Sequence, residues 1–324
     1  MEIVNGFDAS SIEKAAAILN AGDIVAFPTE TVYGLGADAL NPYAVAKIFE
    51  AKRRPHFDPL IVHIGKKDWV FRYAKDVSPD IIKLIDAFWP GPLTLILQKQ
   101  TIIPDIVTAG LPTVGIRMPS HVVALELINA FQKPIAAPSA NPFGYMSPTR
   151  ASHVGTMLEG RVPMILDGGD SVFGIESTIV SFHPGGVYIH RHGAVTEEEL
   201  SGYVHIVHEP RADSLCISPG ELPYHYAPTK PLKIVHSPDE IMTVNSAFLA
   251  FKKLGKPPIS RYVRVLSETG DLKEAAANFF SSLIELDRED VEIIYAERVP
   301  ETGIGRAVME RLKKASKKDG ATGR

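Results

Sequence analysis

The sequence has little of what defines several common classes of protein. It contains one cysteine, Cys216, so it can form neither an internal disulfide nor a cysteine zinc cluster. No apolar run approaches the roughly 18 residues that a membrane-spanning helix needs. The beginning of the chain also lacks a basic segment followed by an apolar stretch. These absences exclude a disulfide scaffold and predict an unexported, cytoplasmic protein without a membrane segment.

An excess of positive charge and the common nucleotide motifs are also missing. With 34 Lys and Arg against 38 Asp and Glu, the formal net charge is -4. No overall basic field would therefore hold nucleic acid, and any RNA contact must be local. The chain has no GxxxxGKS/T, GxGxxG, HExxH or GxSxG motif. A nucleotide would have to be bound by a different arrangement of side chains.

The composition suits an α/β protein with an extensive core. The 324 residues exceed one typical domain, and 45% of them are hydrophobic. Short apolar runs and helical periodicity predict alternating strands and helices. Strands are expected at 24–27, 60–64, 93–97, 114–117, 135–137, 178–182 and 187–190, and helices at 79–88 and 120–131.

Two more helices are indicated near the beginning of the chain. Ser10 and Glu13 have the spacing of a capping box, which predicts a helix that stops at Gly22. The pair formed by Asn41 and the following proline predicts a second helix. Between the two helices, the strand at 24–27 is expected to lead into a polar, glycine-bearing loop at 29–36. Loops that follow strands commonly carry functional sites.

A proline-rich stretch at 208–231 divides the chain. Its prolines recur so closely that no regular element is expected across it. We therefore predict a first domain at 1–207, a linker at 208–231 and a smaller α/β domain at 232–324. In the last of these, strands are expected at 232–235, 262–266 and 291–295, and one helix is expected to start at Asp271.

Four cations stand where they can receive anions. Lys52 and Arg54 end the second helix, where cations either compensate the helix dipole or clamp an anion. Arg117 ends a strand, and its planar guanidinium suits a carboxylate as well as it suits a structural salt bridge. Arg191 closes a later strand of a predicted hairpin. Together they indicate a polar cleft for phosphate and carboxylate groups.

Small polar residues follow another predicted strand. Ser139 and Asn141 project from a turn between two prolines, and Ser147 comes shortly after. Their hydroxyls and backbone amides suit phosphate, although Ser and Asn also satisfy ordinary turns. His63 is expected to be half-buried, either as a core residue or as a ligand. These residues by themselves specify only the class of ligand.

Taken in order, these residues resemble the Sua5/YrdC family. The resemblance rests on the loop PTETVYGL at 28–35, Lys52-x-Arg54, Ser139-x-Asn141 and the run STIV at 177–180. Segments at 218–220 and 225–228 are similar to the longer Sua5 type rather than to the single-domain YrdC form. So is the segment at 303–305 that precedes Arg311 and Leu312.

The resemblance implies both a fold and an activity. The fold would be an N-terminal YrdC-like twisted open α/β sheet with a large cavity, followed by a smaller Rossmann-like C-terminal domain. The activity would be that of a nucleotidyltransferase. Bicarbonate or CO2 adds to the amino group of L-threonine, the carbamate attacks the α-phosphate of ATP, and pyrophosphate leaves.

The product implied is L-threonylcarbamoyl-AMP, which would serve the N6-threonylcarbamoyladenosine modification at position 37 of tRNAs that read ANN codons. A tRNA threonylcarbamoyl transferase complex would receive it, with at most weak contact between tRNA and this chain. The resemblance implies Mg²⁺ that arrives with ATP, no dedicated metal site and no organic prosthetic group.

The resemblance also implies roles for individual residues, and His225 and Tyr226 of the linker would help to cover the cavity as a lid. Lys52 and Arg54 would be catalytic. The threonine pocket would comprise Thr31, His63, Arg117, Ala137 and Ser177. ATP would contact Lys52, Arg54, Asp58, Thr113, Ser139, Asn141, Ser147, Arg191, His225 and Tyr226.

Two other functions stay open at this stage. The first is an RNA-binding module of the tRNA-modification or translation machinery, which the negative net charge disfavours. The second is an enzyme that handles carbamoyl phosphate, because related folds occur in hydrogenase maturation. The single cysteine weighs against it, since that larger protein carries additional zinc-finger-type cysteines.

Overall fold

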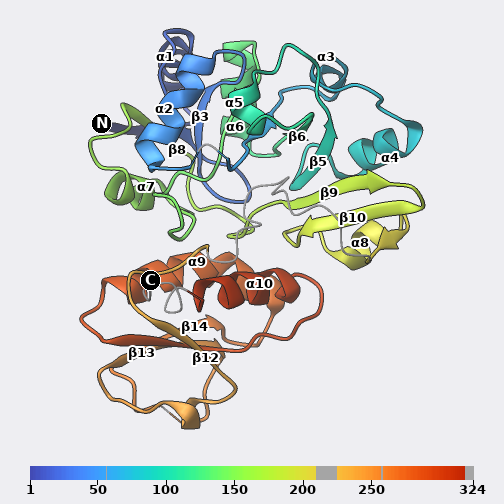
Figure 1. Ribbon diagram of the computed structural model, residues 1–324. Coiled ribbons are helices and arrows are strands. Elements are labelled where there is room, and N and C mark those ends of the chain that lie inside the picture. The colour runs from blue at the N-terminus through green and yellow to red at the C-terminus, as the bar shows by residue number, and fades with distance from the viewer. Residues whose placement is uncertain (56, 209–224, 257, 318–324) are drawn as a thin grey trace.

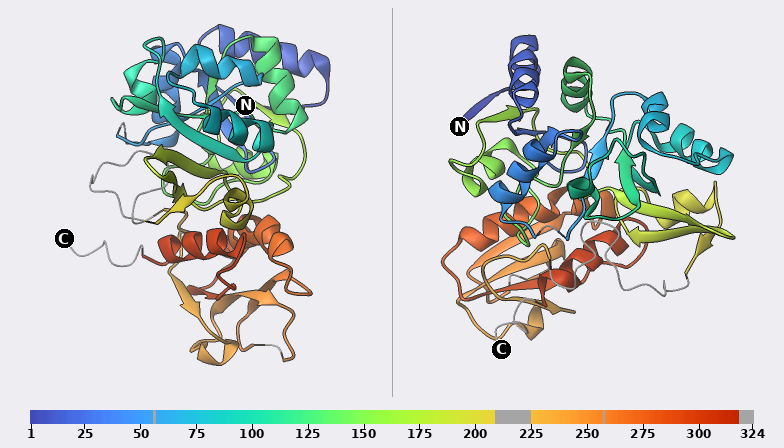
Figure 2. Two further views of the ribbon diagram at one scale, coloured as in Figure 1. Left: turned by 90° about the vertical axis from the view of Figure 1, so that its right-hand side faces the viewer. Right: turned by 45° about the horizontal axis from the view of Figure 1, so that its top comes forward.

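The computed structural model describes residues 1–55, 57–208, 225–256 and 258–317. Within these residues the strands form two separate sheets, one of eleven strands and one of four. Figures 1 and 2 show the larger sheet with its helices above a smaller α/β unit near the C-terminus. No helix in the described ranges has the length and apolar character needed to cross a membrane.

The larger sheet is mixed, with both parallel and antiparallel neighbours. In the described part of the chain its strands run in the order β1-β8-β2-β3-β7-β4-β6-β5-β9-β10-β11. Their bounds are Glu2–Asn5 (β1), Val25–Phe27 (β2), Gly34–Asp38 (β3), Ile61–His63 (β4), Leu93–Gln98 (β5), Thr113–Arg117 (β6), Ile135–Ala136 (β7), Met164–Asp167 (β8), Thr178–His183 (β9), Gly186–Arg191 (β10) and Ile206–Val207 (β11).

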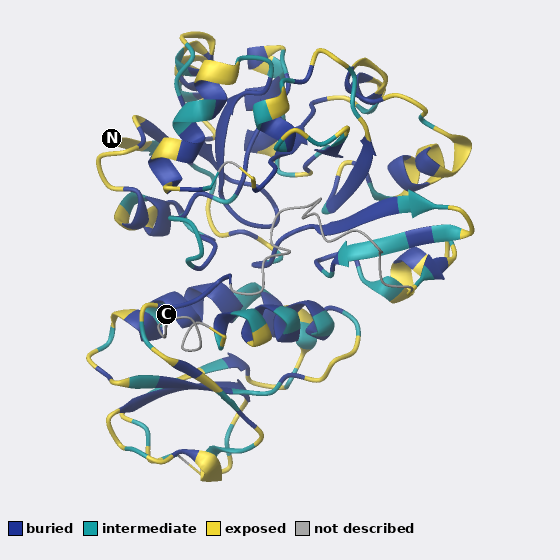
Figure 3. Cartoon of the chain, viewed as in Figure 1, coloured by how far each residue is buried: buried dark blue, intermediate teal, exposed yellow. Residues whose placement is uncertain are grey.

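Short helices connect these strands and cover the sheet. Their bounds are Ala9–Asn20 (α1), Pro42–Lys52 (α2), Val70–Tyr73 (α3), Pro79–Phe88 (α4), Asp105–Thr108 (α5), Val122–Phe131 (α6), Ala151–Met157 (α7) and Glu197–Ser201 (α8). Figure 3 shows a buried sheet interior and helices whose outer faces are exposed. This pattern is expected when amphipathic helices bury one stripe against a sheet.

The register between β4 and β6 brings two predicted site residues together. These strands are parallel neighbours, and His63 pairs with Arg117 at their carboxyl ends. A parallel sheet collects the ends of its strands at one edge, so residues far apart in sequence meet there. The strand β5 runs antiparallel to β6 and parallel to β9, so the start of β9 lies at the same end of the sheet as Arg117. Ser177 comes just before the first paired residue of β9, Thr178.

The C-terminal unit is a small parallel α/β fold. Its strands are Leu232–Val235 (β12), Ser246–Lys252 (β13), Tyr262–Ser267 (β14) and Ile293–Glu297 (β15), and its helices are Leu272–Arg288 (α9) and Gly305–Ala315 (α10). Within the described residues the sheet order is β12-β15-β13-β14, with all neighbours parallel. Both helices lie on the side that faces the larger unit (Figure 1).

Polar contacts join the two units across this interface. The Tyr145 hydroxyl donates to a carboxylate oxygen of Asp287 in α9 at 2.6 Å. Arg306 at the beginning of α10 donates to Glu198 of α8 at 2.7 Å. The interface therefore includes specific hydrogen bonds in addition to buried apolar helix faces.

The structure confirms the α/β fold class and most of the predicted elements. The helix at 79–88 agrees residue for residue, and Asp271 caps α9 by accepting a hydrogen bond from the Glu274 amide at 2.7 Å. Strands β1, β8, β11 and β13 were not predicted. β8 and β13 are almost wholly buried and lack the alternation that marks a half-exposed strand, whereas β1 is mostly exposed and β11 has only two residues. The proposed boundaries at 207 and 231 stay predictions, and linker residues 209–224 lie outside the described residues.

Two local predictions were wrong. The helix α1 begins at Ala9 with Asp8 at the N-cap and no side-chain cap, so the capping box expected at Ser10 and Glu13 does not form. The loop expected at 29–36 is shorter, because β3 already begins at Gly34. A side chain at Gly36 would come within 2.6 Å of Ile135, so this glycine permits close strand packing instead of a loop.

Candidate functional site

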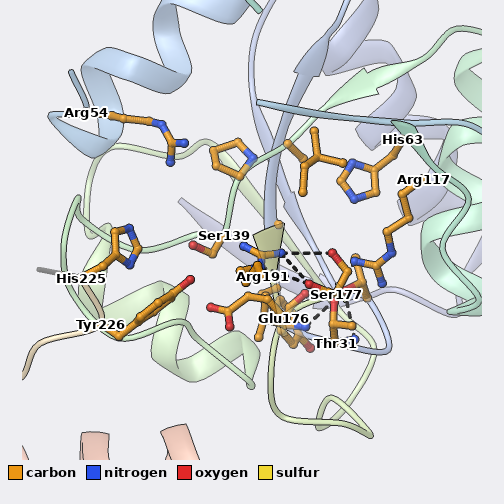
Figure 4. A pocket seen from close by; sticks show the side chains of 17 residues that line it. Thr31, Arg54, His63, Arg117, Ser139, Glu176, Ser177, Arg191, His225 and Tyr226 are labelled. Carbon is orange, nitrogen blue, oxygen red and sulfur yellow. Dashed lines mark hydrogen bonds between the residues drawn. The ribbon is translucent and has the colours of Figure 1, made fainter. Parts of the chain in front are cut away.

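A cavity opens where strand ends of the larger sheet meet the end of the linker. Its walls combine charged, hydroxyl and aromatic side chains with apolar ones, as Figure 4 shows. The lining residues are Thr29, Thr31, Val32, Tyr33, Gly34, Arg54, Ile61, His63, Arg117, Ala137, Pro138, Ser139, Glu176, Ser177, Arg191, His225 and Tyr226. Ten of the fifteen predicted site residues are among them.

One wall is built around Arg117, at the end of β6. Its guanidinium donates to the Thr31 hydroxyl at 3.0 Å and to the Gly91 carbonyl at 3.2 Å, and it pairs with Glu30 at 2.6 Å. Only 3% of Arg117 is exposed. An arginine fixed on several sides loses little conformational entropy when an anion binds, so this group is preorganised to receive a carboxylate.

His63 lies beside this arginine as a neutral imidazole. Burial and the Arg117 charge lower the pKa of His63 to about 3. Each effect disfavours a second positive charge at this wall. At neutral pH the ring therefore offers one donor and one acceptor nitrogen to a polar ligand, rather than a cation.

Ser177 and Arg191 line the cavity side by side. Arg191 donates to the Ser177 carbonyl at 2.9 Å and to its hydroxyl at 3.1 Å. The Ser177 hydroxyl also shares a hydrogen bond of 2.8 Å with Thr94 of β5. An irregularity in the register of the β9 and β10 hairpin occurs between Ile189 and Arg191. Such a bulge redirects a side chain, and here the redirected Arg191 side chain enters the cavity.

Arg54 reaches the cavity from the end of α2. The helix ends because Arg53 adopts a left-handed conformation, with φ of 52°. Asp58, fully buried, pairs with the Arg54 guanidinium at 2.9 Å, and the Pro59 carbonyl accepts from it at the same distance. Asp58 therefore orients Arg54 and does not itself line the cavity.

Lys52 and Asn141 lie behind the Ser139 turn. The Lys52 ammonium donates to the carbonyls of Ser139 and Asn141, and the Asn141 carboxamide donates to the Tyr145 carbonyl at 2.9 Å. Burial and the neighbouring Arg54 hold the pKa of Lys52 well below its usual range. These two side chains hold the turn that presents Ser139 to the cavity, and their predicted ATP contacts stay predictions.

His225 and Tyr226 close another wall. Their rings lie 4.1 Å apart, and the His225 ring also packs edge-on against Phe143. Burial, Arg54 and Lys52 hold the pKa of His225 well below its ordinary value, so this ring is neutral as well. Most of the linker lies outside the described residues, and the predicted lid stays a prediction.

Besides Lys52, Asp58 and Asn141, two further predicted ATP contacts are absent from the cavity lining. Thr113 is the first residue of β6 and lines a separate hollow with Gln98 and Phe182. Ser147 is fully buried, and its hydroxyl donates to a Glu176 carboxylate oxygen. Ser147 is therefore connected to the cavity indirectly, by its hydrogen bond to Glu176, which does line the cavity.

The sequence analysis missed the acidic partners of the site. Glu30 pairs with Arg117, and Glu176 pairs with Arg311 of α10 at 3.1 Å. Neither glutamate was predicted as a site residue, because the expected ligands are anions and a carboxylate repels them. One signal was available: several buried arginines require buried counter-charges nearby. Together with Asp58, which pairs with Arg54, these carboxylates each compensate one buried arginine before any ligand binds.

The described residues contain no group of three or more His, Cys, Asp or Glu side chains arranged to hold a metal ion. Glu176, the carboxylate that lines the cavity, already accepts from Ser147 and pairs with Arg311.

Two family descriptions match the chain. One, Sua5/YciO/YrdC, described as "Telomere recombination", matches residues 17–193. The other, described as "Threonylcarbamoyl-AMP synthase, C-terminal domain", matches residues 195–317. The two matches follow each other along the chain and together cover nearly all of it.

Relatives match over almost the full length. The threonylcarbamoyl-AMP synthase of Pyrococcus abyssi is 40% identical, over 94% of each chain. That of Bacillus subtilis is 41% identical, over 94% of this chain and 92% of its own. A crystal structure of P. abyssi Sua5 complexed with L-threonine superposes with a TM-score of 0.86 and 36% identity, over 98% of each chain.

Proposed function

This chain belongs to the Sua5/YrdC family, and on that basis we propose that it is a threonylcarbamoyl-AMP synthase. The reaction joins L-threonine, bicarbonate or CO2 and ATP into L-threonylcarbamoyl-AMP and pyrophosphate. It transfers an AMP group, which makes the enzyme a nucleotidyltransferase. The observation that carries the proposal is the single cavity that holds both a carboxylate-type receptor, Arg117, and a second set of cationic and aromatic groups.

The Arg117 wall suits the amino acid. Its guanidinium would take the threonine carboxylate, while the Thr31 hydroxyl and the neutral His63 ring would orient the side-chain hydroxyl or the amino group. Ser177 and Ala137 complete the pocket on the same side. A neutral histidine is favourable here, because a protonated ring would have no acceptor nitrogen left for the substrate and would repel its ammonium group.

The remaining groups suit ATP. The carbamate is an anion that attacks an anionic triphosphate, so fixed positive charges lower the barrier most. Arg54 and Arg191 supply such charges, Ser139 adds a hydroxyl, and the rings of His225 and Tyr226 offer surface to the adenosine. Each arginine is already anchored, so little reorganisation is needed when charge shifts to the leaving pyrophosphate.

The expected metal ion is magnesium, as a companion of the nucleotide. We propose that ATP brings Mg²⁺ on its phosphate oxygens, because the described residues hold no cluster of metal ligands. The bound ion would neutralise part of the triphosphate charge. Lys52 would act indirectly, through the turn that carries Ser139.

We further propose that the product passes to a tRNA threonylcarbamoyl transferase complex. The net charge of -4 supports at most weak, local contact between tRNA and this chain. A cytoplasmic location agrees with a single cysteine and with a product consumed on tRNA.

The central experiment is incubation of the protein with ATP, Mg²⁺, bicarbonate and L-threonine, followed by mass spectrometry for threonylcarbamoyl-AMP. Product is expected in the complete mixture and not when threonine or bicarbonate is omitted. Complete mixtures without product would reject the proposal. Turnover only with carbamoyl phosphate, or salt-dependent RNA binding in a gel shift without any turnover, would support the two alternative functions instead.

A further inference from the structure

One arginine of the C-terminal unit reaches the wall of the cavity in the other unit. The Arg311 side chain is fully buried, and it is the largest fully buried side chain among the described residues. It lies on α10, yet its guanidinium pairs with Glu176 of the larger unit at 3.1 Å and donates to the His192 carbonyl. Such a long cation is rarely buried unless its charge is matched.

Two of the groups that Arg311 contacts line the cavity. Glu176 is one of them, and its second carboxylate oxygen accepts from Ser147. Tyr226 is the other, because its ring centre lies 5.4 Å from the guanidinium carbon of Arg311. Figure 4 shows both side chains at the cavity. One residue of α10 therefore holds a carboxylate and an aromatic ring of the proposed active site at the same time.

The charge balance makes this contact important for a nucleotide. Glu176 alone would present a buried negative charge to the cavity, where it would repel the phosphates of ATP. In a partly desolvated site this repulsion is much stronger than in water. Arg311 cancels that charge, and its attraction to the π face of Tyr226 fixes the ring beside it.

We propose that Arg311 is a positioning residue through which the C-terminal unit completes the ATP end of the cavity. It acts through Glu176 and Tyr226 and does not itself touch substrate. The inference rests on the proposed function and assigns a task to the C-terminal unit: only when α10 is docked is the Glu176 charge neutralised and the Tyr226 ring held.

The interface offers a matched control. Arg306 lies on the same helix and also pairs with a carboxylate of the larger unit, Glu198, at 2.7 Å. Neither Arg306 nor Glu198 lines the cavity. Loss of the Arg306 pair removes a cation of α10 at the interface without a direct effect on the site.

The test uses the full chain as wild type and as Arg311→Met, Arg306→Met and Arg311→Met with Glu176→Gln. The KM for ATP and the KM for threonine are measured separately, and thermal unfolding reports the folded fraction. Arg311→Met is expected to raise the KM for ATP about tenfold and the KM for threonine less than about threefold. Arg306→Met is expected to change both by less than about twofold.

Rescue distinguishes positioning from a purely structural role. If the unpaired Glu176 charge is what weakens ATP binding, the double variant should have a lower KM for ATP than Arg311→Met. If Arg311→Met does not fold, Arg311→Lys replaces it, because lysine loses the planar fork that contacts Glu176, the His192 carbonyl and the Tyr226 ring at the same time. It is then expected to raise the KM for ATP above that of Arg306→Met.

The possible results distinguish a failure of the proposed role of Arg311 from a failure of the proposed synthase function. A wild-type protein without product would reject the proposed function. An active wild type, with Arg311 variants that match Arg306→Met or that lower kcat only in proportion to the unfolded fraction, would reject the role of Arg311. So would a double variant with no rescue.

Discussion

At the scale of single residues, the site is organised by arginines that are buried together with carboxylates. Arg117 is paired with Glu30 and Arg54 with Asp58, each at a distance below 3 Å. Removal of one partner of a buried pair leaves an uncompensated charge, whereas the intact pair is close to neutral in stability. The pairs therefore act mainly to hold each guanidinium in one orientation, ready for an anion.

The two arginines should affect different substrates. Arg117→Ala is expected to raise the KM for threonine about tenfold or more, since a charge-assisted hydrogen bond contributes about 1.5–3 kcal/mol. Its effect on ATP should be smaller. Arg54→Ala should mainly raise the KM for ATP or lower kcat. Initial rates at varied threonine and varied ATP test this division of the cavity, and equal effects on both substrates would contradict it.

The low pKa of His63 predicts a pH dependence of stability. Between about pH 6.5 and its folded pKa of about 3, the unfolded chain binds a proton that the folded chain does not. The free energy of unfolding should therefore fall as the pH drops through this window, by at most about 1.4 kcal/mol per pH unit from this residue.

Urea denaturation at several pH values from 7 to 4 tests the prediction. His63→Gln removes the titrating group, so its free energy of unfolding should fall less steeply with acid than that of the wild type. The comparison concerns the slopes, because the substitution also alters packing at every pH. Parallel slopes would show that His63 does not contribute to acid sensitivity.

At the scale of elements, the ends of helices and strands position the functional groups. The helix α2 starts at the Asn41 cap and ends with Lys52, two residues before Arg54. The strands β4 and β6 end with His63 and Arg117 in register. In each case the helix or strand ends at the site. Its rigid backbone therefore holds the functional side chain in a fixed position at the cavity.

The Asn41 cap should stabilise the helix α2 and with it the fold. Its side chain accepts hydrogen bonds from the Tyr43 amide at 3.0 Å and the Ala44 amide at 3.3 Å. Asn41→Ala should lower the free energy of unfolding by about 1 kcal/mol, and Asn41→Asp should largely retain it. Denaturation of both variants measures this difference. Equal losses in the two variants would mean that the cap is not the source of the stability.

At the scale of the whole molecule, the α9 and α10 helices bind the smaller unit to the larger one. Asp287 of α9 accepts from Tyr145 of the larger unit and from Thr229 near the end of the linker. Arg311 of α10 enters the larger unit and pairs with Glu176. The same interface thus connects the two units, the exit of the linker and one wall of the cavity.

A single methyl group should disturb this docking. Gly174 has φ of +62°, and a Cβ there would lie 2.2 Å from the Ala277 carbonyl oxygen in α9. Gly169, with φ of +82°, has nothing within 4 Å of its Cβ position and serves as the control. Both alanine variants carry backbone strain, but only Gly174→Ala adds a clash, which costs about 1–3 kcal/mol more.

Thermal unfolding and limited proteolysis of the two variants test the interface. Gly174→Ala should lower the Tm more than Gly169→Ala does, and it should speed cleavage between the two units. Equal effects of both substitutions would mean that the interface accommodates the methyl group without separation.

Local patterns in the sequence determined the α/β class, the order of most elements and the motifs that carry the family resemblance. Apolar periodicity and turn residues act over a few neighbours, so they can be read directly from the chain. For the same reason the cations of the cavity, such as Arg54 and Arg117, were recognisable in advance at the ends of predicted elements.

Only the tertiary structure decided how the charges of the site are balanced. Glu30 meets Arg117, and Glu176 meets Arg311 across 135 positions of sequence. No local pattern links residues so far apart, because the sheet register and the docking of α10 bring them together. The buried partners that orient the arginines, and the reach of the C-terminal unit into the cavity, follow from long-range packing and could not be read from the sequence.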